Sequence, residues 1–274
     1  MNRKLILGLF VIAVLFVGLA ARPLQDEYSE EIVVGHSQGN HRLDCTVIRP
    51  WNSSVGPGKS EYPVIVWANG WGGNNVEGAD STDGYKDTLI EWALDGPYIV
   101  IAANAWSAQE SDVLACLQWI IDQNNEKRSE YKGVVNTDKI GLSGHSQGGG
   151  AVVKAGDGEP DGFDITTVLT MNPYGPGWVN AGSQDGPVLV LTGANDVVTP
   201  YSWTFPVFEA VQTNGIGGLY AVHQVAGHNN LDYYKPVPIL WWQYTLNGKV
   251  GAGKEVMKIL GKDPWDTQIT DGME

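Results

Sequence analysis

Basic residues, cysteines and metal-binding motifs are scarce in this chain of 274 residues. The sequence holds 17 Lys and Arg against 31 Asp and Glu, a formal charge of −14, and such an acidic surface repels phosphate polymers. Nucleic acid is therefore not an expected partner. The five His and two Cys lack the spacing of His-Glu-x-x-His or of a Cys pair, so the sequence predicts no metal site, and no other cofactor is expected.

The two cysteines, Cys45 and Cys116, stand far apart in the chain. An oxidising compartment would allow them to form a disulfide after export. Two separate buried thiols are an equal alternative, because Cys45 falls in an expected strand and Cys116 on the apolar side of an expected helix. The spacing leaves both possibilities open.

The first 21 residues have the composition of a secretory signal peptide. Asn2-Arg3-Lys4 precedes an uncharged run from Leu5 to Ala21 that ends in small residues. We expect cleavage here and a secreted protein, extracellular or periplasmic, without stable membrane association. An uncleaved anchor is the alternative, since the run approaches membrane-spanning length. Residues 22–274 show no repeat, low-complexity tract or composition break, which predicts a single domain.

Short β-branched runs alternate with amphipathic segments along most of the chain. This alternation predicts an α/β fold with a mostly parallel sheet and helices on both faces. An antiparallel hairpin is expected at the N-terminal edge. The expected strands are 31–36, 41–49, 63–68, 98–103, a strand beginning at 140, 166–171, 187–192 and 218–224, and the expected helices are 85–94, 109–123, one beginning at 151, 203–211, 238–246 and 254–260.

The pattern Gly144-x-Ser146-x-Gly148 stands between the strand that begins at Ile140 and the helix that begins at Ala151. This context is typical of the nucleophile elbow of α/β-hydrolases, in which a sharp turn exposes the serine and needs glycine neighbours. A phosphate-binding loop is the alternative, but the elbow has neither Gly-Lys-Ser/Thr nor Gly-x-Gly-x-x-Gly. Ser146 is therefore the candidate nucleophile.

A serine nucleophile needs a histidine base and a carboxylate that orients the base. In this fold both follow the serine along the chain, the acid first and the histidine last. Asp196 comes directly after an expected strand, and His228 follows a later one. We predict Asp196 as the acid and His228 as the base. Other candidates are less well placed: Asp164 and Asp185 for the acid, and His36, His41, His145 and His223 for the base.

A glycine-rich loop, Asn69-Gly70-Trp71-Gly72-Gly73, follows the expected strand 63–68. α/β-Hydrolases place the first amide of the oxyanion hole in such a loop upstream of the nucleophile. We therefore expect the backbone N–H of Trp71 to serve as one donor. The alternative is a glycine-rich surface loop with an exposed tryptophan.

Together these motifs resemble dienelactone-hydrolase-like α/β-hydrolases, the group that includes bacterial cutinases and poly(ethylene terephthalate)-hydrolysing esterases, over roughly residues 60 to 260. The resemblance implies a second oxyanion amide at Gln147 and substrate contacts at Trp71 and Tyr174. This chain departs from the family pattern in three places. Gln147 replaces a usual methionine, Asn229 follows the histidine where an aromatic residue is common, and no C-terminal cysteine pair is present.

Only Asn172 to Gly186 separates the two expected strands between which many lipases carry a helical cap. A cap does not fit there, so we expect an open groove walled by aromatic side chains. The sequence thus predicts a secreted carboxylic ester hydrolase, cutinase-like or lipase-like, that accepts bulky esters including polymers. The alternatives are a carbohydrate acetyl esterase, a serine peptidase and a non-catalytic secreted binding protein, because the triad alone does not select a substrate.

Overall fold

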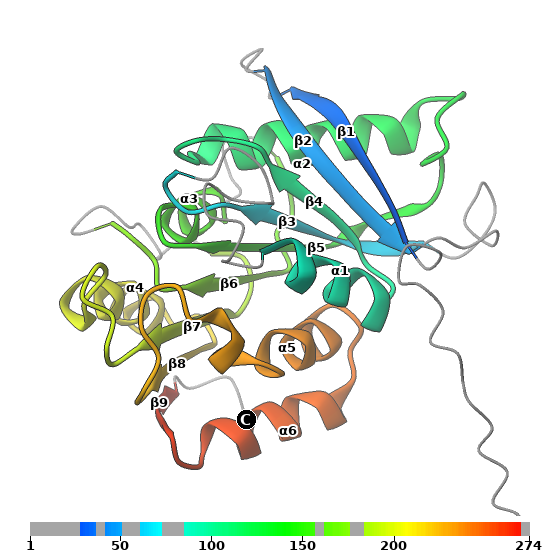
Figure 1. Cartoon of the computed structure of the whole chain (residues 1–274). Coiled ribbons are helices and arrows are strands. Elements are labelled where there is room, and N and C mark those ends of the chain that lie inside the picture. Colours follow the sequence, from blue (N-terminus) through cyan, green and yellow to red (C-terminus); the bar gives the residue numbers. More distant parts are fainter. Residues whose placement is uncertain are drawn as a thin grey trace, which may run out of the picture.

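The computed structural model describes residues 28–36, 42–50, 61–72, 85–156, 162–175 and 184–269. These residues form a nine-stranded sheet in the order β1-β2-β4-β3-β5-β6-β7-β8-β9, with helices on both faces (Figure 1). Strands β3 to β8 are parallel, while β1, β2 and β9 join antiparallel at the two edges. The α/β-hydrolase fold class is confirmed. The expected signal segment lies outside the described residues.

The elements follow the predicted alternation closely. The strands are β1 Tyr28–His36, β2 Arg42–Pro50, β3 Tyr62–Ala68, β4 Ile99–Ala103, β5 Val135–His145, β6 Thr167–Met171, β7 Val188–Gly193, β8 Gly218–His223 and β9 Trp265–Ile269. The helices are α1 Tyr85–Asp95, α2 Glu110–Asn125, α3 Gln147–Ala155, α4 Tyr201–Thr213, the short 3-10 helix η4 Leu231–Tyr234, α5 Val237–Thr245 and α6 Val250–Leu260.

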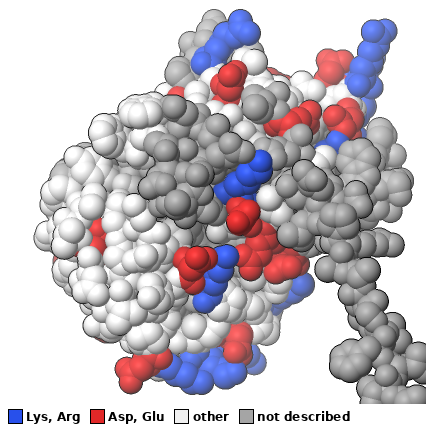
Figure 2. All heavy atoms as spheres, viewed as in Figure 1, with Lys and Arg blue, Asp and Glu red and all other residues white. Residues whose placement is uncertain are grey.

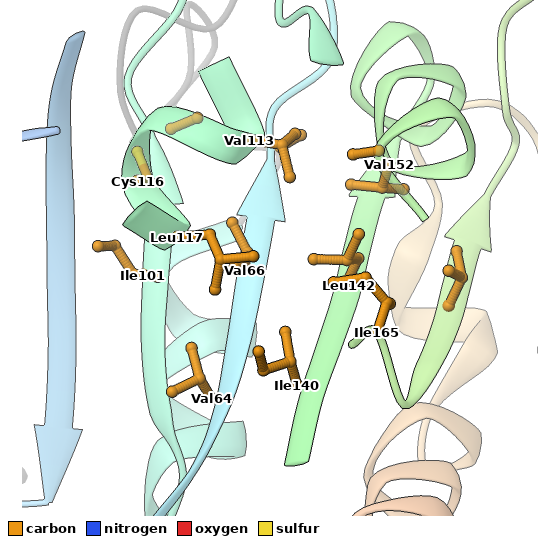
Figure 3. Close-up of a cluster of buried hydrophobic side chains, with 14 of the residues drawn as sticks. Val64, Val66, Ile101, Val113, Cys116, Leu117, Ile140, Leu142, Val152 and Ile165 are labelled. Atoms are coloured by element: carbon orange, nitrogen blue, oxygen red, sulfur yellow. The ribbon is translucent and has the colours of Figure 1, made fainter. Parts of the chain in front are cut away.

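The central strands are apolar because both of their faces are covered. Every residue of β3, β4, β6 and β7 is buried, as expected of parallel strands between two helical layers. Val66, Leu142 and Ile101 pack against Val113 and Leu117 of α2 on one face (Figure 3). Side chains of α3 and α4 belong to the same cluster. Side chains of α1, α5 and α6 cover the opposite face. This packing fixes the carboxyl ends of the strands, where the site residues lie.

The last strand, β9, was not predicted from the sequence. Its five residues are partly or fully exposed and show no apolar run, so the usual strand signal is absent. It pairs antiparallel with β8, and Trp265 packs edge-on against His223 with ring centroids 4.8 Å apart. Tertiary pairing, not local sequence, therefore determines this strand.

The open question about the cysteines is answered by the structure. Cys45 of β2 and Cys116 of α2 form a disulfide, and both residues are fully buried. The bond joins the hairpin edge of the sheet to a helix on its face. Among the described residues, no helix is both long enough and apolar enough to cross a membrane.

Candidate active site

Ser146 occupies a strained turn between β5 and α3. Its backbone has φ 54° and ψ −121°, in a region that residues other than glycine seldom adopt. The flanking glycines make this turn possible. A Cβ on Gly148 would lie 2.1 Å from the carbonyl oxygen of Ala68, and one on Gly144 would lie 2.5 Å from the carbonyl oxygen of Gly148. The Gly-x-Ser-x-Gly pattern thus forms the predicted elbow geometry.

The structure brings Ser146, His228 and Asp196 together from three separate loops. The Ser146 hydroxyl lies 2.9 Å from His228 Nε2, and His228 Nδ1 lies 2.8 Å from Asp196 Oδ2. Because a carboxylate only accepts, Nδ1 carries the proton and Nε2 is free to accept from the serine. This is the hydrogen-bond chain that general-base activation of a serine requires.

Asp196 is buried and its two carboxylate oxygens have partners. Oδ1 accepts from the backbone N–H groups of Val198 and Thr199, both at 2.8 Å, and Oδ2 lies 2.6 Å from the Thr199 hydroxyl. Burial raises the pKa of Asp196, but the hydrogen bonds from His228 and Thr199 outweigh burial and hold the pKa below its ordinary value. The carboxylate is therefore ionised at neutral pH.

The weaker candidates from the sequence lie elsewhere. Asp164 and Asp185 are exposed and precede β6 and β7, whereas the elbow lies at the carboxyl ends of the parallel strands. His223 is buried between Tyr233 and Trp265. His36 ends the edge strand β1, and His41 lies outside the described residues.

The glycine-rich loop after β3 passes beside the nucleophile. A Cβ built on Gly70 would lie only 3.3 Å from Ser146 Cβ, which places the neighbouring Trp71 at the site. Gln147, the first residue of α3, follows the serine directly. The backbone N–H groups of Trp71 and Gln147 remain the candidate oxyanion donors.

The loop after β4 also belongs to the site, which sequence reasoning missed. The N–H of Gly72 donates to the carbonyl of Trp106 at 2.8 Å, and the Gln147 side chain donates to the Ser107 hydroxyl. This loop therefore supports both candidate oxyanion segments. Only its position after a strand could have indicated it, since Trp106 and Ser107 belong to no motif.

Two aromatic pairs flank the serine. The rings of Trp71 and Trp106 lie edge-on, and the side chains are 72% and 52% exposed. On another side, the N–H of Tyr174 donates to the Ser146 carbonyl at 2.8 Å, and the Tyr174 ring meets Trp203 with centroids 5.4 Å apart. Trp178, which follows Tyr174 in the segment between β6 and β7, lies outside the described residues.

Two buried side chains behind the site, His145 and Asn172, were not predicted to take part in it. The sequence offered His145 only as a less well placed candidate for the base, yet its Nε2 lies 2.8 Å from the carbonyl oxygen of His228. Asn172 Nδ2 lies 2.7 Å from the same oxygen. Neither contact leaves a local signal in the sequence, because each joins segments more than 50 residues apart.

Within the described part of the chain, no group of three or more His, Cys, Asp or Glu side chains could hold a metal ion. An apolar pocket of about 350 Å³ lies between α5, α6 and β8, with Leu219, Trp241 and Met257 in its lining. It contains none of the site residues. The triad geometry, and not this pocket, defines the candidate active site.

Comparison with known families adds an independent finding. The model of the PETase family, described as PET hydrolase-like, matches residues 99–232, from β4 to η4. This range contains Ser146, Asp196 and His228 but not Trp71. A search of curated proteins found no match. The match covers just under half of the 274 residues, and together with the fold it shows that the chain resembles the PET hydrolase-like α/β-hydrolases. This resemblance supports an ester hydrolase of the α/β-hydrolase type.

Proposed function

We propose that the protein is a serine esterase that cleaves carboxylic esters through an acyl-enzyme at Ser146. The observation that carries this proposal is the continuous chain from Ser146 Oγ through His228 to Asp196 Oδ2, with steps of 2.9 and 2.8 Å. His228 acts as base and then as acid. Asp196 holds the imidazole tautomer and stabilises its charged form.

The reaction has two parts. Ser146 Oγ attacks the ester carbonyl while His228 Nε2 takes the hydroxyl proton, and the N–H groups of Trp71 and Gln147 stabilise the oxyanion. The tetrahedral intermediate collapses, the C–O bond to the alcohol breaks, and His228 gives its proton to the leaving oxygen. Water then attacks the acyl-enzyme with His228 again as base, and the carboxylic acid leaves Ser146 free.

The surface around the serine supports a neutral, bulky substrate. In Figure 2, the side of the molecule with α4, toward which the parallel strands point, carries almost no charged side chains although the chain is acidic overall. Large apolar side chains are exposed on the loops and at the start of α4 at this end. They are Trp71, Trp106, Tyr174, Val197, Val198, Tyr201 and Val225.

This surface favours esters with apolar acyl or alcohol groups, including polymeric esters met outside the cell after export. A carbohydrate acetyl esterase or a serine peptidase with the same triad is the second candidate. Sugar and peptide substrates present many polar groups, which an uncharged apolar rim would leave without partners. A panel of polyester film, acetylated sugar and peptide substrates separates these possibilities.

A fluorophosphonate probe and Ser146→Ala test the proposal directly. The wild type should react covalently with the probe at Ser146, and the variant should not be labelled. The kcat of the variant should fall by on the order of 10⁶, as in an analogous triad. Ser129→Ala, on the loop after α2, is the matched control and should keep full activity. An active Ser146→Ala, retaining a tenth of wild-type esterase activity, would overturn the assignment.

A further inference from the structure

The main-chain carbonyl of His228 accepts two hydrogen bonds from buried side chains. His145 Nε2 lies 2.8 Å and Asn172 Nδ2 lies 2.7 Å from this oxygen, and the two residues are 2% and 0% exposed. A carbonyl oxygen has two lone pairs, so both are occupied. The donors come from the ends of β5 and β6, whereas His228 lies in the loop after β8.

His145 can donate only in one tautomer, and its surroundings select that tautomer. The Tyr85 hydroxyl is hydrogen-bonded to Nδ1 and serves as its donor, which leaves the ring proton on Nε2. Burial, with a smaller effect of the neighbouring His228, lowers the pKa of His145 to about 3. The ring is therefore neutral at neutral pH. It also packs against the His228 imidazole, with centroids 4.7 Å apart.

The Asn172 amide is likewise fixed in orientation. Its Oδ1 accepts from the Gly193 N–H at 3.1 Å and from the Tyr234 hydroxyl at 2.7 Å, so Nδ2 must face His228. The residue has φ 45°, a left-handed conformation that asparagine tolerates better than most residues. One buried side chain thus connects β7, η4 and the loop that carries the candidate base.

We infer that Asn172 and His145 are positioning residues, which set the His228 imidazole between Ser146 and Asp196 by holding its main-chain carbonyl. This inference rests on the proposed function of the triad. The imidazole must meet two partners at once, at 2.9 and 2.8 Å, from the loop between β8 and η4. A displacement of about 1 Å can reduce turnover by about 10²-fold.

Asn172→Gly tests the first donor without adding backbone strain, because glycine adopts positive φ freely. We expect kcat for 4-nitrophenyl acetate to fall by about 10- to 100-fold, with KM changed by less than about threefold, since substrate contacts remain. Thr167→Val is the matched control. It removes a buried hydroxyl bonded to Trp241 at the opposite end of β6, so it should lower the melting temperature but keep kcat.

The second donor is tested by a pair of substitutions. His145→Gln keeps an N–H donor of similar reach, whereas His145→Phe keeps a flat ring without one. We expect the glutamine variant to retain clearly more kcat than the phenylalanine variant. In the ¹H NMR spectrum, the downfield signal of the His228 Nδ1 proton bonded to Asp196 should weaken in His145→Phe and in Asn172→Gly, but not in Thr167→Val.

Two results would overturn the inference. One is a folded Asn172→Gly variant with at least half of the wild-type kcat. The other is equal kcat in His145→Gln and His145→Phe, which also decides the matter if Asn172→Gly does not fold. Failure of the proposed function is recognised separately, since Ser146→Ala would then remain active and the wild type would resist the fluorophosphonate.

Discussion

The indole rings of Trp71 and Trp106 meet edge to face, with centroids 6.1 Å apart, although they follow different strands. A hydrogen bond from the Gly72 N–H to the Trp106 carbonyl joins the two loops beside the rings. Since a Cβ on Gly70 would approach Ser146 within 3.3 Å, the pair stands next to the nucleophile. The two exposed rings form one aromatic wall, and we propose that a flat acyl group contacts it.

Removing either ring should therefore weaken turnover of aromatic esters. Trp71→Ala and Trp106→Ala should each lower kcat/KM for 4-nitrophenyl benzoate several-fold, because an aromatic contact contributes about 0.5–1.5 kcal/mol beyond buried area. The loss for 4-nitrophenyl acetate, which has the same leaving group but no acyl ring, should be smaller. Trp119→Ala, a change in α2 at a ring that packs against Tyr131, serves as control. Equal losses on both esters would show that the wall is structural only.

Asp196→Asn should reduce kcat by about 10⁴-fold while the protein stays folded, because an amide at this position favours the wrong imidazole tautomer. The carboxylate accepts four hydrogen bonds, from His228, Thr199 and Val198, and the amide can accept fewer. The matched change is Asp185→Asn at an exposed carboxylate before β7. If Asp185→Asn were the more damaging of the two, Asp196 would not be the acid.

Acid should destabilise the fold in part through His145. Its pKa is lowered to about 3 by burial, so between that pH and the higher pKa of the unfolded chain the unfolded state binds one proton more than the native state. The free energy of unfolding must then fall as pH decreases, by up to about 1.4 kcal/mol per pH unit from this group. The melting temperature of His145→Gln should drop less steeply from about pH 6 to 4 than that of the wild type. Parallel curves would contradict this account.

Activity should fall in acid, since a protonated His228 cannot accept the Ser146 proton. Initial rates with 4-nitrophenyl acetate, corrected for spontaneous hydrolysis, measure this dependence. A metal chelator should leave the rates unchanged. Activity lost with the chelator and restored by zinc or calcium would reveal a metal requirement.

The strands, the nucleophile elbow and the chain order of the triad residues could be predicted from the sequence, because each has a local pattern. The apolar run Val64-Ile65-Val66 indicates a central strand whichever strands lie beside it. Glycine is required at position 148 because a side chain there would collide with the Ala68 carbonyl. Chain order then located Asp196 and His228, and the structure brings both to Ser146. Their catalytic roles, with those of Trp71, Gln147 and Tyr174, stay predictions.

The unpredicted features depend on contacts between distant segments. Strand β9 is exposed along most of its length and exists through pairing with β8. The loop that carries Trp106 belongs to the site because it forms hydrogen bonds with Gly72 and Gln147. Asn172 belongs to it because its side chain donates a hydrogen bond to the main-chain carbonyl of His228. No residue type or spacing near these positions indicates such contacts, so only the folded chain reveals them.

The disulfide between Cys45 and Cys116 closes a covalent ring of the chain around β3, α1 and β4, and the Trp71 and Trp106 loops lie inside this ring. A protease that cut one peptide bond anywhere in the ring would therefore release no fragment. The nicked protein would migrate as one band in a denaturing gel without reductant and as two bands after reduction. Both sides of the aromatic wall would stay attached to the part of the chain that carries Ser146, Asp196 and His228.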